Sequence, residues 1–203
     1  SAEHSPTAPL TRGWRLFAIN ATTGKGIWNI TGAAAPGIIA DGYMTASNFY
    51  DGYLYTFGKG KSATTASAPQ TAITQGQNVI ISGTVLDQSP AQPGTPAVSA
   101  DSMGEWMAYL HMQHAIPSNV IGVPVSIDTI DPNGNPVHIA TVTSDMSGTF
   151  GYTWAPTIPG QYKITATFAG DESYGSSWAQ TYATVTQAPA ETPTPTATTT
   201  AQA

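Results

Sequence analysis

The chain has 203 residues, a net charge of −6 and charged side chains at 9% of its positions, where an ordinary soluble domain has about 25%. The acidic balance and the lack of any Lys/Arg cluster argue against nucleic acid or an anionic membrane as a partner. Cysteine is absent, which excludes disulfides, thiolate metal sites and cysteine nucleophiles. A surface of Thr, Ser, Ala, Gly and Pro is more common outside the cell than inside it, so we expect an extracellular, cell-surface protein.

Residues 1–61 are expected to form an N-terminal arm followed by a β segment. Two apolar runs occupy about residues 14–32 and 41–58. Both runs contain dipeptides that favour the positive φ angles of tight hairpin turns. These dipeptides are Thr23-Gly24, Asp41-Gly42 and Asp51-Gly52.

The β segment carries a motif that resembles the blade repeat of quinoprotein-type (PQQ-like) β-propellers. The pattern Leu-x-Ala-x-x-x-x-Thr-Gly-Lys-x-x-Trp is formed by Leu16, Ala18, Thr23, Gly24, Lys25 and Trp28, and Asp51-Gly-Tyr-Leu-Tyr55 is similar to the strand pair of a following blade. A propeller closes with at least about four blades, whereas residues 14–60 hold about one and a half. The resemblance therefore implies either the end of a propeller or a pseudo-propeller segment that pairs with something else.

Residues 62–187 are expected to form a connector and an Ig-like β-sandwich. The Ser/Thr/Ala-rich stretch 59–77 is interpreted as the connector, with no core positions in 62–69. Beyond it, apolar and polar residues alternate in short runs separated by Gly, Pro, Asn and Asp, which is typical of half-buried antiparallel strands. The runs cover residues 78–86, 123–130, 137–143, 148–154, 161–168 and 178–185. The fold class predicted is all-β: a propeller-like β segment followed by an Ig-like β-sandwich with one helical insertion.

The helical insertion is predicted at about residues 99–116. Met103, Trp106, Met107, Leu110 and His114 follow helical spacing, and Ser102-Met-Gly-Glu105 is interpreted as a capping box. Trp106 is expected to be the buried anchor of this insertion, because its neighbours in helical phase are apolar.

The span 70–187 resembles the Ig-like module that follows propeller repeats in large archaeal surface proteins. The segments that carry the likeness are Val85–Pro96, Glu105–Gln113 and Phe168–Tyr174. The resemblance implies an exported surface protein and brings no catalytic residues.

Residues 188–203 form a Thr/Pro-rich tail, which favours an extended conformation. In proteins of the kind it resembles, such a stalk leads to a membrane anchor, so membrane contact is expected only through a missing or removed C-terminal anchor. Pro193 and Pro195 cannot donate to a β ladder, whereas Thr favours strands. Thr196, Thr198 and Thr200 are therefore the candidate assembly residues.

Two groups of side chains are weighed as metal ligands. Thioethers and imidazoles of the helix suit copper, but helical geometry separates Met112 from Met107 by about 140°, which favours core and edge positions instead. Carboxylates and amides around a hairpin suit Ca²⁺, but the same residues are ordinary turn formers, which we favour. The first group is Met103, Met107, His111, Met112 and His114; the second is Asp128, Asp131, Asn133, Asn135 and Asp145. No metal and no cofactor are expected.

No catalytic constellation is predicted. The four histidines are scattered between an arm, a helix end and a strand, and no Gly-x-Ser-x-Gly or His-Glu-x-x-His motif occurs. Asn20 and Asn29 begin glycosylation sequons.

We therefore expect a non-enzymatic structural protein, a subunit of a surface filament or surface layer that assembles as a homopolymer through β-strand addition between copies. One alternative is a C-terminal fragment of a larger quinoprotein-like surface protein with a ligand-binding, adhesion or redox role. Another is a glycan-binding adhesin that uses the aromatic residues Tyr50, Tyr53 and Tyr55.

Overall fold

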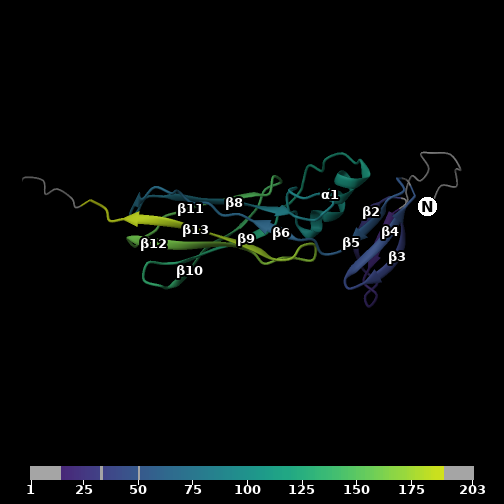
Figure 1. Cartoon of the computed structure of the whole chain (residues 1–203), viewed down its shortest axis with the longest axis horizontal. Helices are drawn as coiled ribbons and strands as arrows, with labels where there is room; N and C mark the ends of the chain where they lie inside the picture. The colour runs from purple at the N-terminus through teal and green to yellow at the C-terminus, as the bar shows by residue number, and fades with distance from the viewer. Residues whose placement is uncertain (1–14, 33, 50, 190–203) are drawn as a thin grey trace, which may run out of the picture.

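The computed structural model describes residues 15–32, 34–49 and 51–189, which form one elongated body with two β regions and a helix between them (Figure 1). The N-terminal segment, residues 15–57, contains β1 to β5. The remaining strands belong to a sandwich, and helix α1 is inserted after β8. The elements are β1 Arg15–Ile19, β2 Gly26–Thr31, β3 Ala34–Ala40, β4 Tyr43–Asn48, β5 Leu54–Phe57, β6 Ser62–Thr64, β7 Ile73–Thr74, β8 Val79–Asp87, α1 Ala100–Met112, β9 Pro124–Ile130, β10 Pro136–Thr143, β11 Thr149–Trp154, β12 Gly160–Phe168 and β13 Ser177–Thr186.

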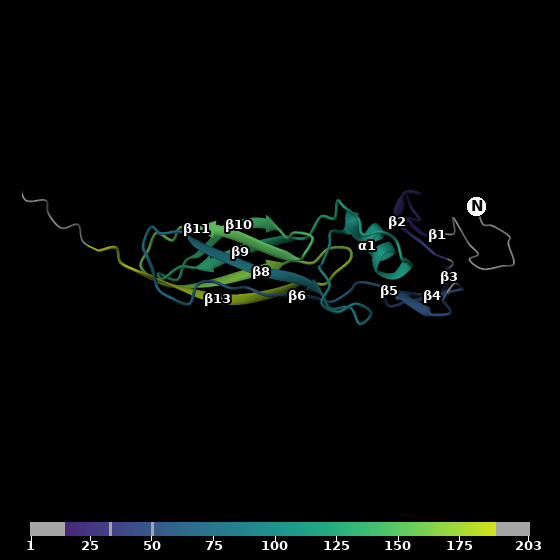
Figure 2. The same ribbon diagram turned by 90° about the horizontal axis from the view of Figure 1, so that it is seen from above.

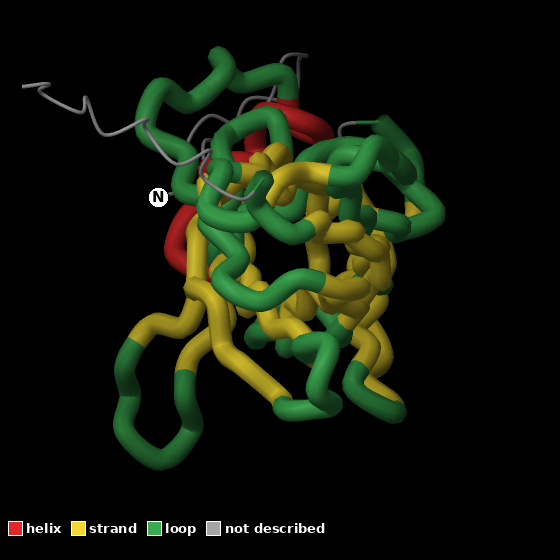
Figure 3. Tube along the Cα trace, turned by 90° about the vertical axis from the view of Figure 1, so that its left-hand side faces the viewer, coloured by secondary structure: helices red, strands yellow, loops and turns green. Residues whose placement is uncertain are grey.

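Two facing sheets make the Ig-like β-sandwich. One sheet has five strands in the order β10-β9-β12-β13-β7, and the other has three in the order β11-β8-β6. All neighbours pair antiparallel except β7 and β13, which are parallel. Figure 3 looks along the long axis from the sandwich end, with the helix behind the strands. The expected all-β chain with a sandwich and one helical insertion is confirmed.

Alternation of apolar and polar residues decides which face of each strand is buried. In β12, Tyr162, Ile164, Ala166 and Phe168 are buried and the residues between them face outward. The strands expected in residues 123–185 begin and end within a residue or two of the observed ones. The sandwich core therefore follows from the sequence pattern. Its buried members are Ala68, Ile81, Val85, Ala97, Val123, Val125, Ile127, Phe150, Tyr162, Ile164, Ala166, Phe168, Tyr174, Ala183 and Val185.

The stretch interpreted as a connector is part of the sandwich, so that expectation is wrong. Strand β6 pairs with β8, β7 pairs with the end of β13, and Ala68 is buried in the core. The chain crosses β8 at close range because Gly83 has no side chain: a Cβ there would lie 2.0 Å from the carbonyl oxygen of Thr65. Small Ala, Ser and Thr side chains permit this approach, although their low complexity is typical of linkers.

Helix α1 begins three residues earlier than the proposed capping box implies. Ser99 is the N-cap, with no side-chain cap hydrogen bond. Ser102 lies inside the helix, where its hydroxyl accepts a hydrogen bond from the backbone N–H of Ile121 at 3.0 Å. The capping box is therefore wrong, because Ser102 ties the helix to the following loop. Trp106 is 4% exposed, so its expected burial is confirmed.

The N-terminal segment forms two small sheets, β1-β2 and β3-β4-β5. The expected turns are present, with φ of 49° at Asp41 and 79° at Gly42. The segment completes its core with a residue of α1, since Ala108 is buried together with Leu16, Ile30 and Ala46. Met103, at the other end of the helix, packs against the sandwich core. The helix therefore joins the two β regions, as Figure 2 shows.

Candidate functional site

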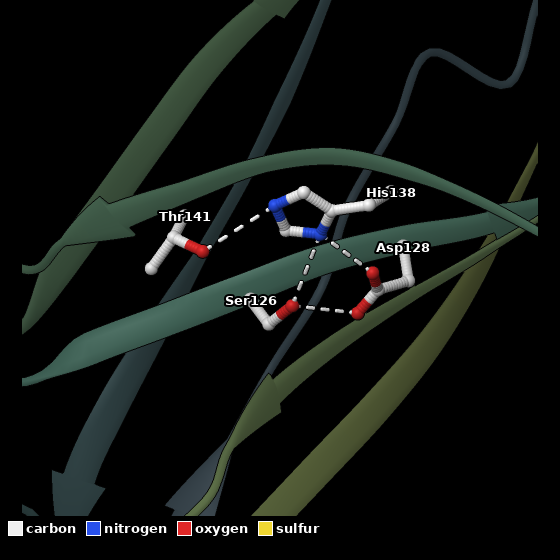
Figure 4. Close-up of polar contacts among 4 residues, drawn as sticks. All are labelled: Ser126, Asp128, His138 and Thr141. Carbon is white, nitrogen blue, oxygen red and sulfur yellow. Dashed lines mark hydrogen bonds and ion pairs between the residues drawn. The ribbon is translucent and has the colours of Figure 1, made fainter.

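Four polar side chains converge on the outer face of the five-stranded sheet (Figure 4). Ser126 and Asp128 alternate with the buried residues of β9, so both point outward. Asp128 is paired with His138 of β10, and Ser126 with Thr141. His138 and Thr141 would lie on opposite faces of a regular strand. The register shift between His138 and Ala140 adds one residue and brings both to the same face.

The cluster is held by a short hydrogen-bonded network. Nδ1 of His138 lies 2.7 Å from Oδ1 of Asp128, and the Ser126 hydroxyl donates to Oδ2 of Asp128 at 2.7 Å. The Thr141 hydroxyl oxygen lies 3.4 Å from Nε2 of His138. Because both carboxylate oxygens have partners, the side chains hold one another in place.

Ser126 does not occupy the position of the nucleophile in a hydrolase triad, and Thr141, on the Nε2 side of His138, lies at 3.4 Å, beyond the usual reach of a nucleophile–base hydrogen bond. In a triad the nucleophilic hydroxyl and the carboxylate contact opposite ring nitrogens of the histidine, whereas Ser126 and Asp128 both approach Nδ1 of His138. The side chains of His138 and Asp128 are 55% and 46% exposed, so water screens the pair and its contribution to stability is small. The geometry suits a surface that hydrogen-bonds a ligand.

Sequence reasoning did not find this cluster. It placed His138 in a strand and found no Ser-His-Asp set. The alternation of β9 was sufficient to put Ser126 and Asp128 on one face. The strand pairing and the register shift at residue 139 bring His138 and Thr141 to the same face, and they carry no recognisable signal in the sequence.

A second group of polar and aromatic residues joins the N-terminal segment to the helix. The Tyr55 ring meets the His111 ring edge-on at 6.2 Å, and its hydroxyl donates to Oδ2 of Asp51 at 2.6 Å. Burial lowers the pKa of His111, and the charge of Asp87 opposes this shift. Burial also raises the pKa of Tyr55, with a further contribution from the hydrogen bond to Asp51. Burial therefore favours the neutral form of the imidazole at this contact.

A third polar contact lies inside the sandwich, near its helix end. The hydroxyl of Tyr174 donates to Oδ2 of Asp87 at 3.2 Å, and both residues are buried. Burial, followed by the charge of Asp87, raises the pKa of Tyr174. Asp87 Oδ1 accepts from the backbone N–H of Ser89. With both oxygens bonded, Asp87 acts as a structural acceptor.

The proposed copper ligands are divided between two hydrophobic cores. Met103 packs in the sandwich, whereas Met107 and Met112 pack with the N-terminal segment. His111 contacts Tyr55, and His114 is exposed beyond the end of the helix. This division agrees with the core-and-edge interpretation.

The proposed calcium ligands act as turn residues. Oδ1 of Asp131 accepts the backbone N–H groups of Asn133 and Asn135, and Oδ1 of Asp145 accepts those of Ser147 and Thr149. Hydrogen bonds from the Asn135 side chain and backbone lower the pKa of Asp131. Asp128 belongs to the polar cluster described above. Within the described ranges, His, Asp and Glu side chains do not gather in threes as a metal site would require.

The other predicted site residues are spread along the molecule. Asn20 is exposed in a turn, where its side-chain oxygen accepts the backbone N–H groups of Thr22 and Thr23. Asn29 is half-buried in β2, and its side-chain oxygen accepts hydrogen bonds from the Arg15 guanidinium. Of the three aromatic residues, Tyr53 is 71% exposed and Tyr55 is partly covered. Tyr50, Thr196, Thr198, Thr200 and the arm at 1–12 lie outside the described residues.

Helix α1 has 13 residues, and none of the helices in the described part of the chain is long and apolar enough to cross a bilayer.

No protein-family model and no curated protein matches the sequence. Two solved structures are similar to it in part. The CARDB domain of a Pyrococcus furiosus protein, in complex with di-metal ions, has 15% identity and a TM-score of 0.35, with 64% of this chain and 91% of that chain covered. A tetra-tandem repeat in the extending region of a large adhesion protein has 18% identity and a TM-score of 0.37, with 70% of this chain and 30% of that chain covered. The assignment of the sandwich rests on the strand order described above.

Proposed function

We propose that the chain is a non-enzymatic structural protein of the cell surface, which assembles with copies of itself through its N-terminal segment. The observation that carries this proposal is the exposed apolar surface of that segment. Eight of its large apolar side chains are between 53% and 76% exposed, and a large exposed apolar patch marks an interaction site. The residues are Phe17, Ile19, Ile27, Ile38, Ile39, Tyr43, Tyr53 and Leu54.

The shape of the molecule favours a head-to-tail contact. The N-terminal segment lies at one end of the body, and β13 leaves the sandwich at the other (Figure 1). Strand β13 starts near the N-terminal segment, since the N–H of Gly175 donates to the carbonyl of Gly60 at 2.8 Å, just beyond β5. A contact between opposite ends of two copies is heterologous, and heterologous contacts that do not close into a ring produce filaments.

Chain length supports strand addition between copies rather than within one. The seven residues from Ala190 to Thr196 span at most about 25 Å when fully extended. The ten residues of β13 span about 33 Å. Thr196 therefore cannot return along the sandwich to the N-terminal segment of its own chain. A strand that includes Thr196, Thr198 and Thr200 would pair with a neighbouring copy, at an edge such as that of β5.

The second candidate is a C-terminal fragment of a larger quinoprotein-like propeller protein. The motif around Thr23-Gly24 and the hairpin turns of β3 to β5 favour it, and neighbouring blades would cover the same apolar surface. The two candidates differ in what covers that surface, which is another copy in the first and another part of a longer protein in the second.

The test is the mass of the chain in solution over a range of concentrations, measured by light scattering. Self-assembly predicts a mass that rises with concentration and falls to that of a monomer when residues 188–203 are deleted or when Ile38 and Ile39 are both replaced by Ser. Deletion of residues 1–12 tests the arm in the same way. A monodisperse monomer at every concentration would rule out assembly and leave the propeller fragment. The extracellular location is part of the proposal because the chain carries few charged residues.

A further inference from the structure

The outer face of the five-stranded sheet carries two exposed aromatic side chains on its β13 strand. Trp178 is 64% exposed and Tyr182 is 49% exposed. Both alternate with the buried residues Thr181, Ala183 and Val185, so they point to the same side, away from the core. Four residues of a strand separate them by about 13 Å. Their rings are therefore available along a line parallel to β13.

Polar side chains cover the sheet beside these rings in two rows. Strand pairing forms the first row across four neighbouring strands. It contains Trp178, Thr167, Ser126 and Thr141, in that order. The next row contains Gln180, Thr165, Asp128 and His138 in the same order across the four strands. Since neighbouring strands lie about 4.8 Å apart, Ser126 is about 10 Å from Trp178 across the sheet. A six-membered ring placed over Thr167 would contact the indole on one side and the polar cluster on the other.

The polar groups in these rows are pre-arranged. Asp128 binds both His138 and Ser126, and the Gln180 amide donates to the hydroxyl of Thr165 at 3.3 Å. Hydroxyl and amide groups offer both donors and acceptors. This combination matches a ligand whose own groups are hydroxyls, because each hydroxyl donates one hydrogen bond and accepts others.

The charge of this face favours an uncharged ligand. Asp128 is paired with His138, and Lys163, opposite Tyr182, is the cation of the adjacent row. A dense set of hydroxyls would remain hydrated in a protein–protein contact, and the N-terminal segment, which suits such a contact, carries half of the exposed large apolar residues of the described chain. Aromatic faces with polar neighbours and balanced charge fit a molecule that is apolar on its ring face and polar around its rim.

We propose that the outer face of the five-stranded sheet binds a neutral glycan chain, which stacks on Trp178 and Tyr182 and hydrogen-bonds to Ser126 and Asp128. The chain runs parallel to β13, across the two polar rows. This site is separate from the N-terminal surface, so it does not depend on self-assembly. It replaces the aromatic set Tyr50, Tyr53 and Tyr55 as the glycan-binding surface.

The test is electrophoresis of the native chain through gels that contain a soluble neutral polysaccharide: mannan, laminarin, dextran or hydroxyethyl cellulose, one in each gel. We expect retarded migration in at least one gel. The dissociation constant obtained from its concentration dependence should rise at least tenfold in Trp178→Ala and by a smaller factor in Tyr182→Ala and Ser126→Ala. These side chains point away from the core, so circular dichroism should show that each variant remains folded.

The control is Tyr152→Ala, which removes a 37% exposed tyrosine from β11 in the other sheet and should migrate like the native chain. Three results would overturn the proposal. Two of them are no retardation in any of the four gels and retardation that Trp178→Ala leaves unchanged. A third is a mass in solution that rises with concentration and falls in Trp178→Ala, since this would make the face a contact between copies. The mass does not depend on glycan binding, so failure of the glycan site and failure of self-assembly give separate results.

Discussion

At the scale of single residues, Trp106 tests how α1 is held in place. Its side chain is 4% exposed, and its Nε1 has no hydrogen-bond partner among the described residues. We expect Trp106→Ala to lower the free energy of unfolding by about 3–5 kcal/mol, because a large buried ring is lost. Limited proteolysis should then cut within residues 97–119, while the sheets stay intact.

Trp106→Phe is the matched variant. It keeps most of the ring and removes the unpaired N–H, whose burial is unfavourable. Urea denaturation should show a much smaller loss of stability than for Trp106→Ala. Equal losses in the two variants would mean that the indole N–H has a partner in solution.

Gly83 tests the close crossing of residues 65–67 over β8. A Cβ at this position would lie 2.0 Å from the carbonyl oxygen of Thr65 and 2.6 Å from the ring of Phe150. We expect Gly83→Ala to cost about 1–3 kcal/mol of stability through overpacking, measured by urea denaturation. The control is Gly151→Ala, on the paired strand, where the nearest atom is the Ile81 carbonyl oxygen at 3.9 Å. A stable Gly83→Ala variant would show that residues 65–67 do not pack against β8 as described.

At the scale of elements, the contact between α1 and β5 predicts a dependence on pH. The pKa of His111 in the folded chain lies below its ordinary value, which is about 6.5. The unfolded chain therefore binds a proton at His111 more readily than the folded chain does. Stability should decrease as the pH falls through this region, because protonation opposes burial of the imidazole against Tyr55.

The measurement is urea denaturation at pH 7.5 and 5.5. The difference between the two should be smaller in His111→Gln, which cannot be protonated. His114→Gln, at an exposed position just after the helix, serves as the control and should keep the difference seen in the native chain. An unchanged difference in His111→Gln would show that other groups carry the pH dependence.

At the scale of the whole molecule, the N-terminal segment and the sandwich share α1 without sharing a continuous core. The buried cluster of the N-terminal segment includes Ala108, with Met107 and Met112 packed around it. The segment therefore needs the helix to complete its core. Part of its apolar surface is covered by its own chain, whereas the sequence suggested that another copy would cover it.

We expect a fragment of residues 59–189 to unfold cooperatively in urea, because it contains every strand of the sandwich. A fragment of residues 70–189 lacks β6 and the buried Ala68, so its midpoint should lie at a lower urea concentration or its transition should be lost. Equal midpoints would restore the connector interpretation of residues 62–69. A lost transition in both fragments would mean that the N-terminal segment is required for the sandwich to fold.

The sequence by itself determined the strands of residues 123–186 and their buried faces. Alternation of apolar and polar residues over so many consecutive runs indicates half-buried strands. It also determined the turns at Asp41-Gly42 and Asp51-Gly52, where few residues tolerate positive φ. Burial of Trp106 followed from helical spacing, but the start of the helix did not, because Ser102 bonds to a distant loop residue.

The tertiary structure decided what depends on contacts between distant segments. Residues 59–77 became part of the sandwich because Gly83 permits a close crossing that local composition does not reveal. Ser126, Asp128, His138 and Thr141 came together through strand pairing and one extra residue in β10. The helix came to serve both β regions because Met103 and Ala108 face different partners. Local pattern specifies which face of an element is apolar, whereas only the assembled chain specifies what that face meets.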